Sequence, residues 1–351
     1  MGATAGRSGD DRRGLLAPGP VPPAPEPRTA GAVAVALREL LVAGRLDLPL
    51  PGGGDTVGRW AALASFGRRD LCLARLAEGH TDAVAILAEA GRTPDPGCLY
   101  GVWASRYRGA VVRLEPAGAT SWSLTGRMPF CSGAGLVDRA LVVADRAGDG
   151  RPVLVAADVT GPRVVAEPGT WPAVGMDASA SADVTFRGVP VSADDVVGPP
   201  GFYTGRCGFW LGGAGVAAVW LGGSAEAVDT AAAALAERMP DPDPHRLAHL
   251  ATLHCRTASV DALMTTAAAT VDADPGADHS LLAGTCRSAA EQAAREVLDL
   301  VPVITGPSPL TRDRGLARRL ADLQVYIRQH HGGADLAALG RQLLDARLRR
   351  A

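Results

Sequence analysis

Small polar side chains end an apolar stretch in the middle of the chain, and they are the first residues suited to ligand binding. The segment Trp122–Ala134, WSLTGRMPFCSGA, predicts a strand, a tight turn at Gly126-Arg127 and a second short apolar run. Phe130 offers a flat face for stacking, and Cys131 and Ser132 are followed by residues small enough to admit a ligand to the backbone. The alternative is that Phe130 belongs to the core and Ser132 caps a turn.

Two adjacent histidines near the C-terminus, His330 and His331, are suited to proton transfer, because an imidazole titrates near neutral pH. The alternative is that they cap the last helix. Glu78 and His80, which flank Gly79, form a second candidate site, but a helix that ends at Gly79 with a capping polar group is the simpler interpretation.

Two further patterns do not predict a site. His245 and His249 lie one turn apart on an expected helix, but His254 falls off that face and no carboxylate completes a metal-ligand set, so we expect no metal. The run Gly212–Gly215 lacks the preceding strand that a nucleotide-binding loop needs, which favours close helix packing.

The composition is that of an ordinary globular protein. The 351 residues are 47% hydrophobic and 21% charged, and the length favours two or three domains. A net charge of −2 gives no reason to expect a nucleic acid or an acidic membrane as partner. All 35 basic residues are arginine, which excludes a lysine Schiff base.

Six scattered cysteines without a CxxC motif favour free thiols in a reducing compartment. The N-terminus has no apolar signal-peptide core, and the most apolar run, Phe209–Ala225, reads as a buried helix rather than a membrane span. We therefore expect a cytoplasmic protein.

Periodicity divides the chain into four parts: a disordered tail (1–28), an N-terminal helical domain (29–97), a middle β domain (98–203) and a C-terminal four-helix bundle (204–351). The β domain predicts an antiparallel barrel or sandwich, so the fold class is α+β. Expected helices cover 30–43, 57–66, 70–79, 83–90, 213–237, 245–271, 280–300 and 315–348. Expected strands cover 110–114, 122–125, 140–144, 152–157, 163–165, 182–186 and 189–191.

This order of domains, together with three segments, resembles the acyl-CoA dehydrogenase family. The first segment is Trp122–Ala134 with the strand Asp138–Ala144. The second runs from Trp171 to Val191, and the third lies within Leu310–Leu344. From the first segment to the last, the resemblance spans about two thirds of the chain.

The resemblance implies that FAD lies between the β domain and the C-terminal bundle. It places Phe130 beside the isoalloxazine, with Cys131 and Ser132 at its hydrogen-bonding edge. The family's Thr-Glu-Pro loop and its Arg-x-x-Phe-Gly motif are both missing. Trp103 and Ser105 stand where the loop would be, and Arg238 stands where the motif's phosphate-binding arginine would be.

The resemblance also implies a catalytic Glu near the C-terminus, but the matching stretch Tyr326–Gly333 carries His330 and His331 instead. Dehydrogenation of an acyl thioester needs a carboxylate base, whereas flavin-dependent monooxygenases that resemble the family carry a histidine there. We expect an FAD-dependent oxidoreductase acting on an acyl thioester or a related small substrate. The alternatives are a monooxygenase of the same fold and an inactive homologue that serves as a subunit or interaction partner.

The family implies a homo-oligomer, or a hetero-oligomer with a related subunit. An electron-transfer flavoprotein is a further possible partner.

Overall fold

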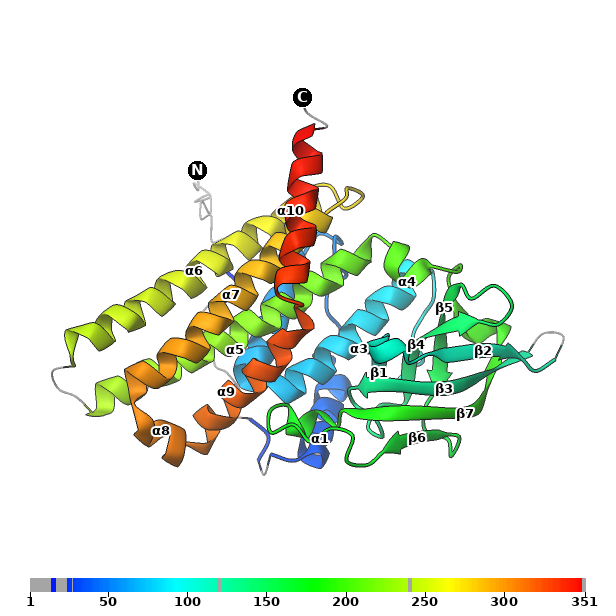
Figure 1. Ribbon diagram of the computed structural model, residues 1–351, viewed down its shortest axis with the longest axis horizontal. Coiled ribbons are helices and arrows are strands. Elements are labelled where there is room, and N and C mark those ends of the chain that lie inside the picture. The colour runs from blue at the N-terminus through cyan, green and yellow to red at the C-terminus, as the bar shows by residue number, and fades with distance from the viewer. Residues whose placement is uncertain (1–13, 17–23, 27, 119–120, 239–241, 349–351) are drawn as a thin grey trace, which may run out of the picture.

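The computed structural model describes residues 14–16, 24–26, 28–118, 121–238 and 242–348. Long helices lie on one side of an eight-stranded sheet, as Figure 1 shows. The helices are α1 Ala30–Val42, α2 Thr56–Arg69, α3 Leu71–Glu89, α4 Phe202–Gly205, α5 Gly208–Arg238, α6 Pro244–Ala273, α7 Ser280–Thr305, α8 Pro307–Arg312, α9 Arg314–Tyr326 and α10 Gly333–Leu348. The strands are β1 Tyr100–Trp103, β2 Val112–Pro116, β3 Ser121–Cys131, β4 Arg139–Arg146, β5 Pro152–Asp158, β6 Val164–Glu167, β7 Ala182–Ser192 and β8 Val196–Val197.

The sheet is mostly antiparallel, with strand order β6-β7-β3-β2-β4-β5-β8 and β1 paired to β4. Two of its pairings, β1–β4 and β2–β4, are parallel, which the sequence did not predict. Strand β4 is apolar on both faces: Ala140 and Val142 join the main core, whereas Leu141 and Val143 pack with Ile86 of α3. The sheet is thereby fixed to the N-terminal helices.

Helix α3 is longer than predicted. It begins at Leu71, where the Asp70 carboxylate accepts from the backbone N–H of Leu73 at 2.8 Å, and continues without a break through Gly79. The prediction of separate helices at 70–79 and 83–90 was therefore wrong, because the apolar periodicity on either side of Gly79 belongs to one helix.

The predicted turn at Gly126-Arg127 was also wrong. Strand β3 is continuous from Ser121 to Cys131, and it pairs with β7 along its length, with register shifts at Leu124/Thr125 and between Met128 and Cys131. A strand with bulges accommodates the same small and polar residues that a turn would use.

Helices α5, α6, α7 and α9 form the C-terminal bundle, and α2 packs closely on α5. A Cβ added at Gly222 of α5 would lie 2.0 Å from the carbonyl oxygen of Ala64, so this crossing admits only glycine. Among the described residues α5 is the one helix long and apolar enough to cross a membrane, but 83% of its most apolar stretch is buried inside the chain.

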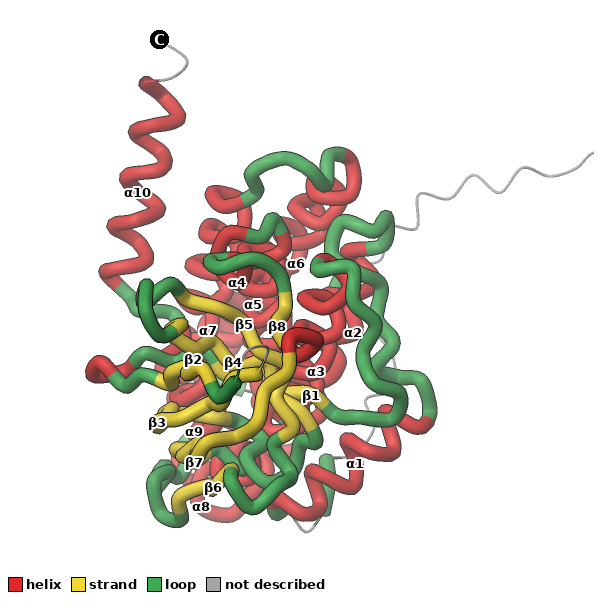
Figure 2. The backbone as a smooth tube through the Cα atoms, turned by 90° about the vertical axis from the view of Figure 1, so that its right-hand side faces the viewer, coloured by secondary structure: helices red, strands yellow, loops and turns green. Residues whose placement is uncertain are grey.

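The last predicted helix, 315–348, is divided. Helix α9 ends at Tyr326, a 3₁₀ turn covers Ile327–Gln329, and α10 begins again at Gly333. Figures 1 and 2 show α10 projecting from the body of the molecule, and none of its residues is buried. The break places residues 329–331 beside the bundle rather than on a helix surface.

The tail predicted for residues 1–28 lies mostly outside the described residues. Of those that are described, Leu15 and Arg28 are buried against the helices. The proposed domain boundaries remain predictions.

Candidate functional site

Two adjoining cavities lie where the sheet, α3 and the C-terminal helices meet. The serine cavity, of about 720 Å³, is lined by Ser132, Ser179 and Ser181 together with Phe130 and Trp171. The histidine cavity, of about 420 Å³, is lined among others by His330, His331, Glu78 and Arg287. Arg75 and Gln329 line both cavities, so the two share a wall.

Aromatic side chains form one side of the serine cavity. The Phe130 ring is 45% exposed, and its centroid lies 5.0 Å from the ring of Tyr107 and 6.2 Å from that of Trp171. Phe130 adopts a φ of 63°, which is unfavourable for a bulky residue. The strained backbone turns a large apolar face outward, where it is available for stacking.

A chain of hydroxyl groups forms another side of the serine cavity. The Ser179 hydroxyl donates to the carbonyl of Met176 (2.7 Å), so it accepts from Ser181 (2.8 Å), which in turn accepts from Ser132 (3.1 Å). The lone pairs of the Ser132 oxygen are left free to accept from a ligand. The indole N–H of Trp171, another lining residue, is buried without a hydrogen-bond partner among the described residues.

The floor of the serine cavity is held by a buried ion cluster. Gly175 and Met176 lie in this floor, and the Met176 N–H donates to Asp322 of α9 at 2.5 Å. The Arg28 guanidinium pairs with Asp322, with Asp70 at 2.8 Å and with Asp177 at 3.3 Å.

Cys72, Asp177 and Asp322 also bring possible metal-ligand atoms within 4.8 Å of one another. The Arg28 guanidinium donates to Cys72 Sγ at 2.8 Å and to both carboxylates. Arg28 therefore supplies positive charge where a metal ion would lie.

His330 is an uncharged hydrogen-bond donor in the histidine cavity. Its Nδ1 accepts from the backbone N–H of Gly332 at 3.1 Å, which leaves the proton on Nε2, 3.1 Å from the Ser288 hydroxyl. Burial lowers the pKa of His330, which keeps the ring uncharged near neutral pH. His331 lies at the rim, exposed, with Nδ1 3.3 Å from Asp335 Oδ1.

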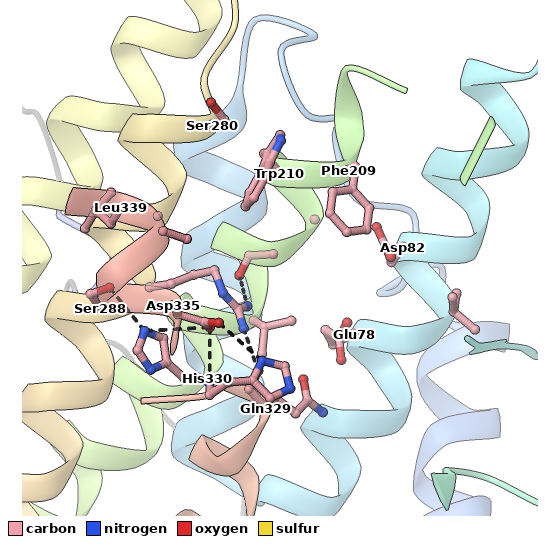
Figure 3. A pocket seen from close by; sticks show the side chains of 18 of the residues that line it. Glu78, Asp82, Phe209, Trp210, Ser280, Ser288, Gln329, His330, Asp335 and Leu339 are labelled. Atoms are coloured by element: carbon pink, nitrogen blue, oxygen red, sulfur yellow. Dashed lines mark hydrogen bonds and ion pairs between the residues drawn. The ribbon is translucent and has the colours of Figure 1, made fainter. Parts of the chain in front are cut away.

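Helix α3 lines the opposite side of the histidine cavity with charged groups. Figure 3 shows Glu78 and Asp82 across the cavity from His330 and Asp335. Glu78 Oε2 accepts from the Arg75 guanidinium and from the Tyr326 hydroxyl, the latter at 3.2 Å. Burial raises the pKa of Glu78 even though Arg75 opposes the shift.

The structure places four of the eight predicted site residues at these cavities: Phe130 and Ser132 at the serine cavity, and His330 and His331 at the histidine cavity. Their roles as cofactor-binding and catalytic residues remain predictions.

Three of the other predicted residues, Trp103, Ser105 and Cys131, line neither cavity. Trp103 is buried behind the serine cavity and donates to the backbone carbonyl of Ser132 at 3.0 Å. The Cys131 thiol points into the core toward Met128 O, and burial raises its pKa. Ser105 accepts weakly from the Tyr107 N–H at 3.4 Å. Arg238 ends α5, and its side chain lies outside the described part of the chain.

Sequence reasoning missed the wall formed by α3. It weighed Glu78 and His80 together and preferred a helix cap. The structure separates them: Glu78 faces the cavity, whereas His80 is buried with Nδ1 accepting from Tyr100 N at 3.1 Å. Arg75, Glu78 and Asp82 recur at helical spacing in an otherwise apolar helix, and this was the available signal for a charged, buried face.

Comparison with known proteins supports the fold of this chain but does not show a closer relationship to any one protein family. No family model matches the chain, and no curated protein matches it. The structure of KijD3 in complex with FMN and dTDP-3-amino-2,3,6-trideoxy-4-keto-3-methyl-D-glucose is 23% identical, with a TM-score of 0.75 over 96% of this chain and 97% of KijD3.

Two further structures have similar scores. Dibenzothiophene monooxygenase (TdsC) from Paenibacillus sp. A11-2 is 21% identical, with a TM-score of 0.72 over 90% of this chain and 96% of that one. Butyryl-CoA dehydrogenase from Megasphaera elsdenii is 17% identical, with a TM-score of 0.73 over 91% of this chain and 95% of that one. These likenesses confirm the α+β fold class predicted from the sequence. The chain has the fold of the acyl-CoA dehydrogenases, in a divergent form without the usual C-terminal glutamate.

Proposed function

We propose that this chain is a flavin-dependent oxidoreductase that binds flavin in the serine cavity and its substrate in the histidine cavity. The observation that carries the proposal is the wall shared by the two cavities at Arg75 and Gln329, which means that a flat ligand in one cavity and a second molecule in the other would be neighbours. The same fold holds FMN in KijD3 and in TdsC.

The residues of the serine cavity fit a flavin. Phe130 and Trp171 supply aromatic faces, and the Ser132 hydroxyl supplies an acceptor. A bound flavin supplies the capacity to accept or donate two electrons. The sequence resemblance favours FAD, whereas KijD3 and TdsC were solved with FMN, so both are to be tested.

Monooxygenation is the reaction we favour. His330 stands where the resemblance places the dehydrogenase base, and it is a neutral donor rather than a carboxylate. The histidine cavity is also rich in charge, with Arg206, Arg287 and Asp335 in its lining, which suits a small polar substrate better than a long acyl chain.

Dehydrogenation is the second candidate, and Glu78 is the observation in its favour. This carboxylate lines the histidine cavity, and its raised pKa is a property of general bases that act near neutral pH. An electron-transfer flavoprotein would be the partner for this reaction only. The third interpretation, an inactive homologue that acts as a subunit, predicts that no flavin binds.

The proposal includes the cellular location and the oligomeric state of the enzyme. Six cysteines without a disulfide are consistent with a cytoplasmic location. Leu336, Leu343, Leu344 and Leu348 are exposed along α10, which supports a homo-oligomer that covers this helix with a second copy.

The first experiment is a visible spectrum of the purified protein, followed by titration with FMN and with FAD. We expect flavin bands and saturable binding of at least one of the two. A protein that binds neither flavin overturns the proposed function and leaves the inactive homologue.

The second experiment separates the two reactions. Anaerobic mixing of the flavin-loaded protein with butyryl-CoA and longer acyl-CoAs bleaches the flavin if the chain is a dehydrogenase. If it is a monooxygenase, acyl-CoAs do not bleach the flavin. Substrate-dependent oxygen uptake then requires an added flavin reductase, with indole and an amino-sugar nucleotide as first probes.

A further inference from the structure

Arg75 lies at the wall between the two cavities and lines both of them. It projects from α3 one turn before Glu78, and its side chain is 16% exposed. Of the described residues that line the cavities, Arg75 and Gln329 are common to both, and Arg75 is the charged one of the two.

Two neighbouring side chains position the Arg75 guanidinium. It donates through Nη1 to Glu78 Oε2, and it is also hydrogen-bonded to the Tyr326 side chain. The Tyr326 hydroxyl donates to the same carboxylate oxygen. Glu78 and Tyr326 therefore hold in place a charged group that lines both cavities.

Flavin reduction changes the charge of the ring. Two electrons and one proton convert the neutral oxidised ring into an anion near neutral pH. A cation beside the ring favours the reduced form, and a carboxylate disfavours it, because charge near the ring tunes its electronics. The effect of such a charge on the reduction potential is large where solvent is excluded, as it is at Arg75 (16% exposed) and Glu78 (8% exposed).

We propose that Arg75 sets the reduction potential of the flavin bound in the serine cavity, and that Glu78 opposes it as the counter-charge that positions the guanidinium. The inference rests on the proposed function, since it requires flavin in that cavity. It assigns a role to a pair of charges that otherwise counts only as a buried ion pair.

The two charges predict shifts of opposite sign. In Arg75→Gln the midpoint potential of bound FMN falls, and in Glu78→Gln it rises, because the cation is then uncompensated. Arg75→Lys keeps the charge and retains most of the wild-type potential. The ratio of the Kd for reduced FMN to that for oxidised FMN rises in Arg75→Gln, on the order of tenfold.

Arg328 provides the matched control. It is a second cation in the lining of the serine cavity, but it is exposed to solvent. Arg328→Gln removes the same charge from the same cavity, and screening by water and salt makes its shift smaller than that of Arg75→Gln.

The experiment is a reductive titration of the FMN-loaded proteins with dithionite against a reference dye. Shifts of the same sign in Arg75→Gln and Glu78→Gln, or a shift in Arg75→Gln no larger than in Arg328→Gln, overturn the inference. If Arg75→Gln fails to fold, the midpoint potentials of Glu78→Gln and Arg75→Lys still test the inference. If the wild type binds flavin and both Arg75→Gln and Glu78→Gln keep the wild-type midpoint potential, this inference is wrong but the proposed function stands. If the wild type binds no flavin, the proposed function is wrong.

Discussion

At the scale of single residues, the serine cavity depends on hydroxyl groups whose proton directions are fixed by their neighbours. Ser132 donates to Ser181 and so presents lone pairs to the cavity. A residue can therefore be essential to binding without being acidic, basic or aromatic, and its role is visible only from the direction of the hydrogen-bond chain.

Ser132→Ala removes the free acceptor and is expected to weaken FMN binding by about 1 kcal/mol, roughly fivefold in Kd. Fluorescence titration with FMN measures this. Ser105→Ala is the matched control, because Ser105 lines neither cavity, and its Kd stays at the wild-type value. Equal effects of the two substitutions would show that Ser132 does not contact the flavin.

We expect the buried His80 to make the free energy of unfolding depend on pH. Burial lowers its pKa to about 4, so the unfolded chain takes up a proton at higher pH than the folded chain does. The folded protein is therefore favoured above pH 6.5 and loses that advantage as the pH falls toward 4. The shift corresponds to about 3 kcal/mol of unfolding free energy.

His80→Gln can still accept from the Tyr100 N–H but does not titrate. Urea unfolding at pH 7.5 and at about pH 4.5 should show a smaller loss of stability on acidification in this variant than in the wild type. His254→Gln, at an exposed position of α6, should behave like the wild type. The explanation is wrong if His80→Gln loses as much stability on acidification as the wild type.

At the scale of elements, the site depends on contacts between segments far apart in the chain. Gly175 shows this most directly: a Cβ added there would lie 2.1 Å from the carbonyl oxygen of Ala321 in α9. The cavity floor therefore lies directly on a helix backbone.

Gly175→Ala should push the floor away from α9, at a cost of about 1–3 kcal/mol in stability, and weaken FMN binding. Thermal unfolding and FMN titration test both effects. Gly276→Ala is the control, since its Cβ would meet no atom within 4 Å. If Gly175→Ala lowers the melting temperature but leaves the Kd for FMN unchanged, the floor does not shape the flavin site.

The elements themselves were largely predictable from sequence. Apolar periodicity located α1, α2, α5, α6 and α7 and six of the eight strands, because each buries a continuous apolar face. The prediction of two strands at 182–186 and 189–191 was wrong, since both segments belong to β7. Strands β1 and β8 were missed because they are short, and their pairing with β4 and β5 comes from distant sequence.

The candidate site was predictable only in part, because local pattern does not reveal which buried side chains face a cavity. Phe130 and Ser132 stood out through the small residues beside them, whereas Glu78 looked like a helix cap. The break at 327–332 was missed although Gly332-Gly333 is a sequence signal for a helix break. Its position also depends on Tyr326, which donates to Glu78, 248 positions earlier. Contacts of this separation are decided by tertiary packing, not by propensity.

At the scale of the whole molecule, α10 is a helix that the rest of the chain does not cover. It projects from the body of the molecule (Figure 2). Leu344 is 64% exposed and Leu348 is 76% exposed. A helix that exposes leucines along its length is an unfavourable surface for a monomer in water.

We expect light scattering to give a mass that is a multiple of 35.9 kDa for the wild type. The double substitution Leu343→Glu/Leu344→Glu should give the monomer mass, because two buried charges would oppose association. Leu247→Glu, at an exposed leucine of α6, should leave the mass of the wild type unchanged. A monomeric wild type would contradict the proposed homo-oligomer.

Arg28 joins the two ends of the chain through one buried guanidinium. It pairs with Asp70 at the start of α3, with Asp177 beside the cavity floor and with Asp322 in α9. Arg28→Met would leave buried carboxylates unpaired and should lower the unfolding free energy by about 3–5 kcal/mol. Because Asp322 also holds Met176, the same variant should lose FMN affinity.

Arg38→Met is the matched comparison for urea unfolding and FMN titration. Arg38 pairs with Asp138 at 2.6 Å, but the two side chains are 40% and 28% exposed. A pair in contact with water contributes at most about 1 kcal/mol, so the loss of stability should be several times smaller than in Arg28→Met. Equal losses would mean that the buried ion pairs of Arg28 contribute no more to stability than an exposed ion pair does. A destabilised Arg28→Met with wild-type FMN affinity would mean that the cluster supports the fold but not the cavity floor.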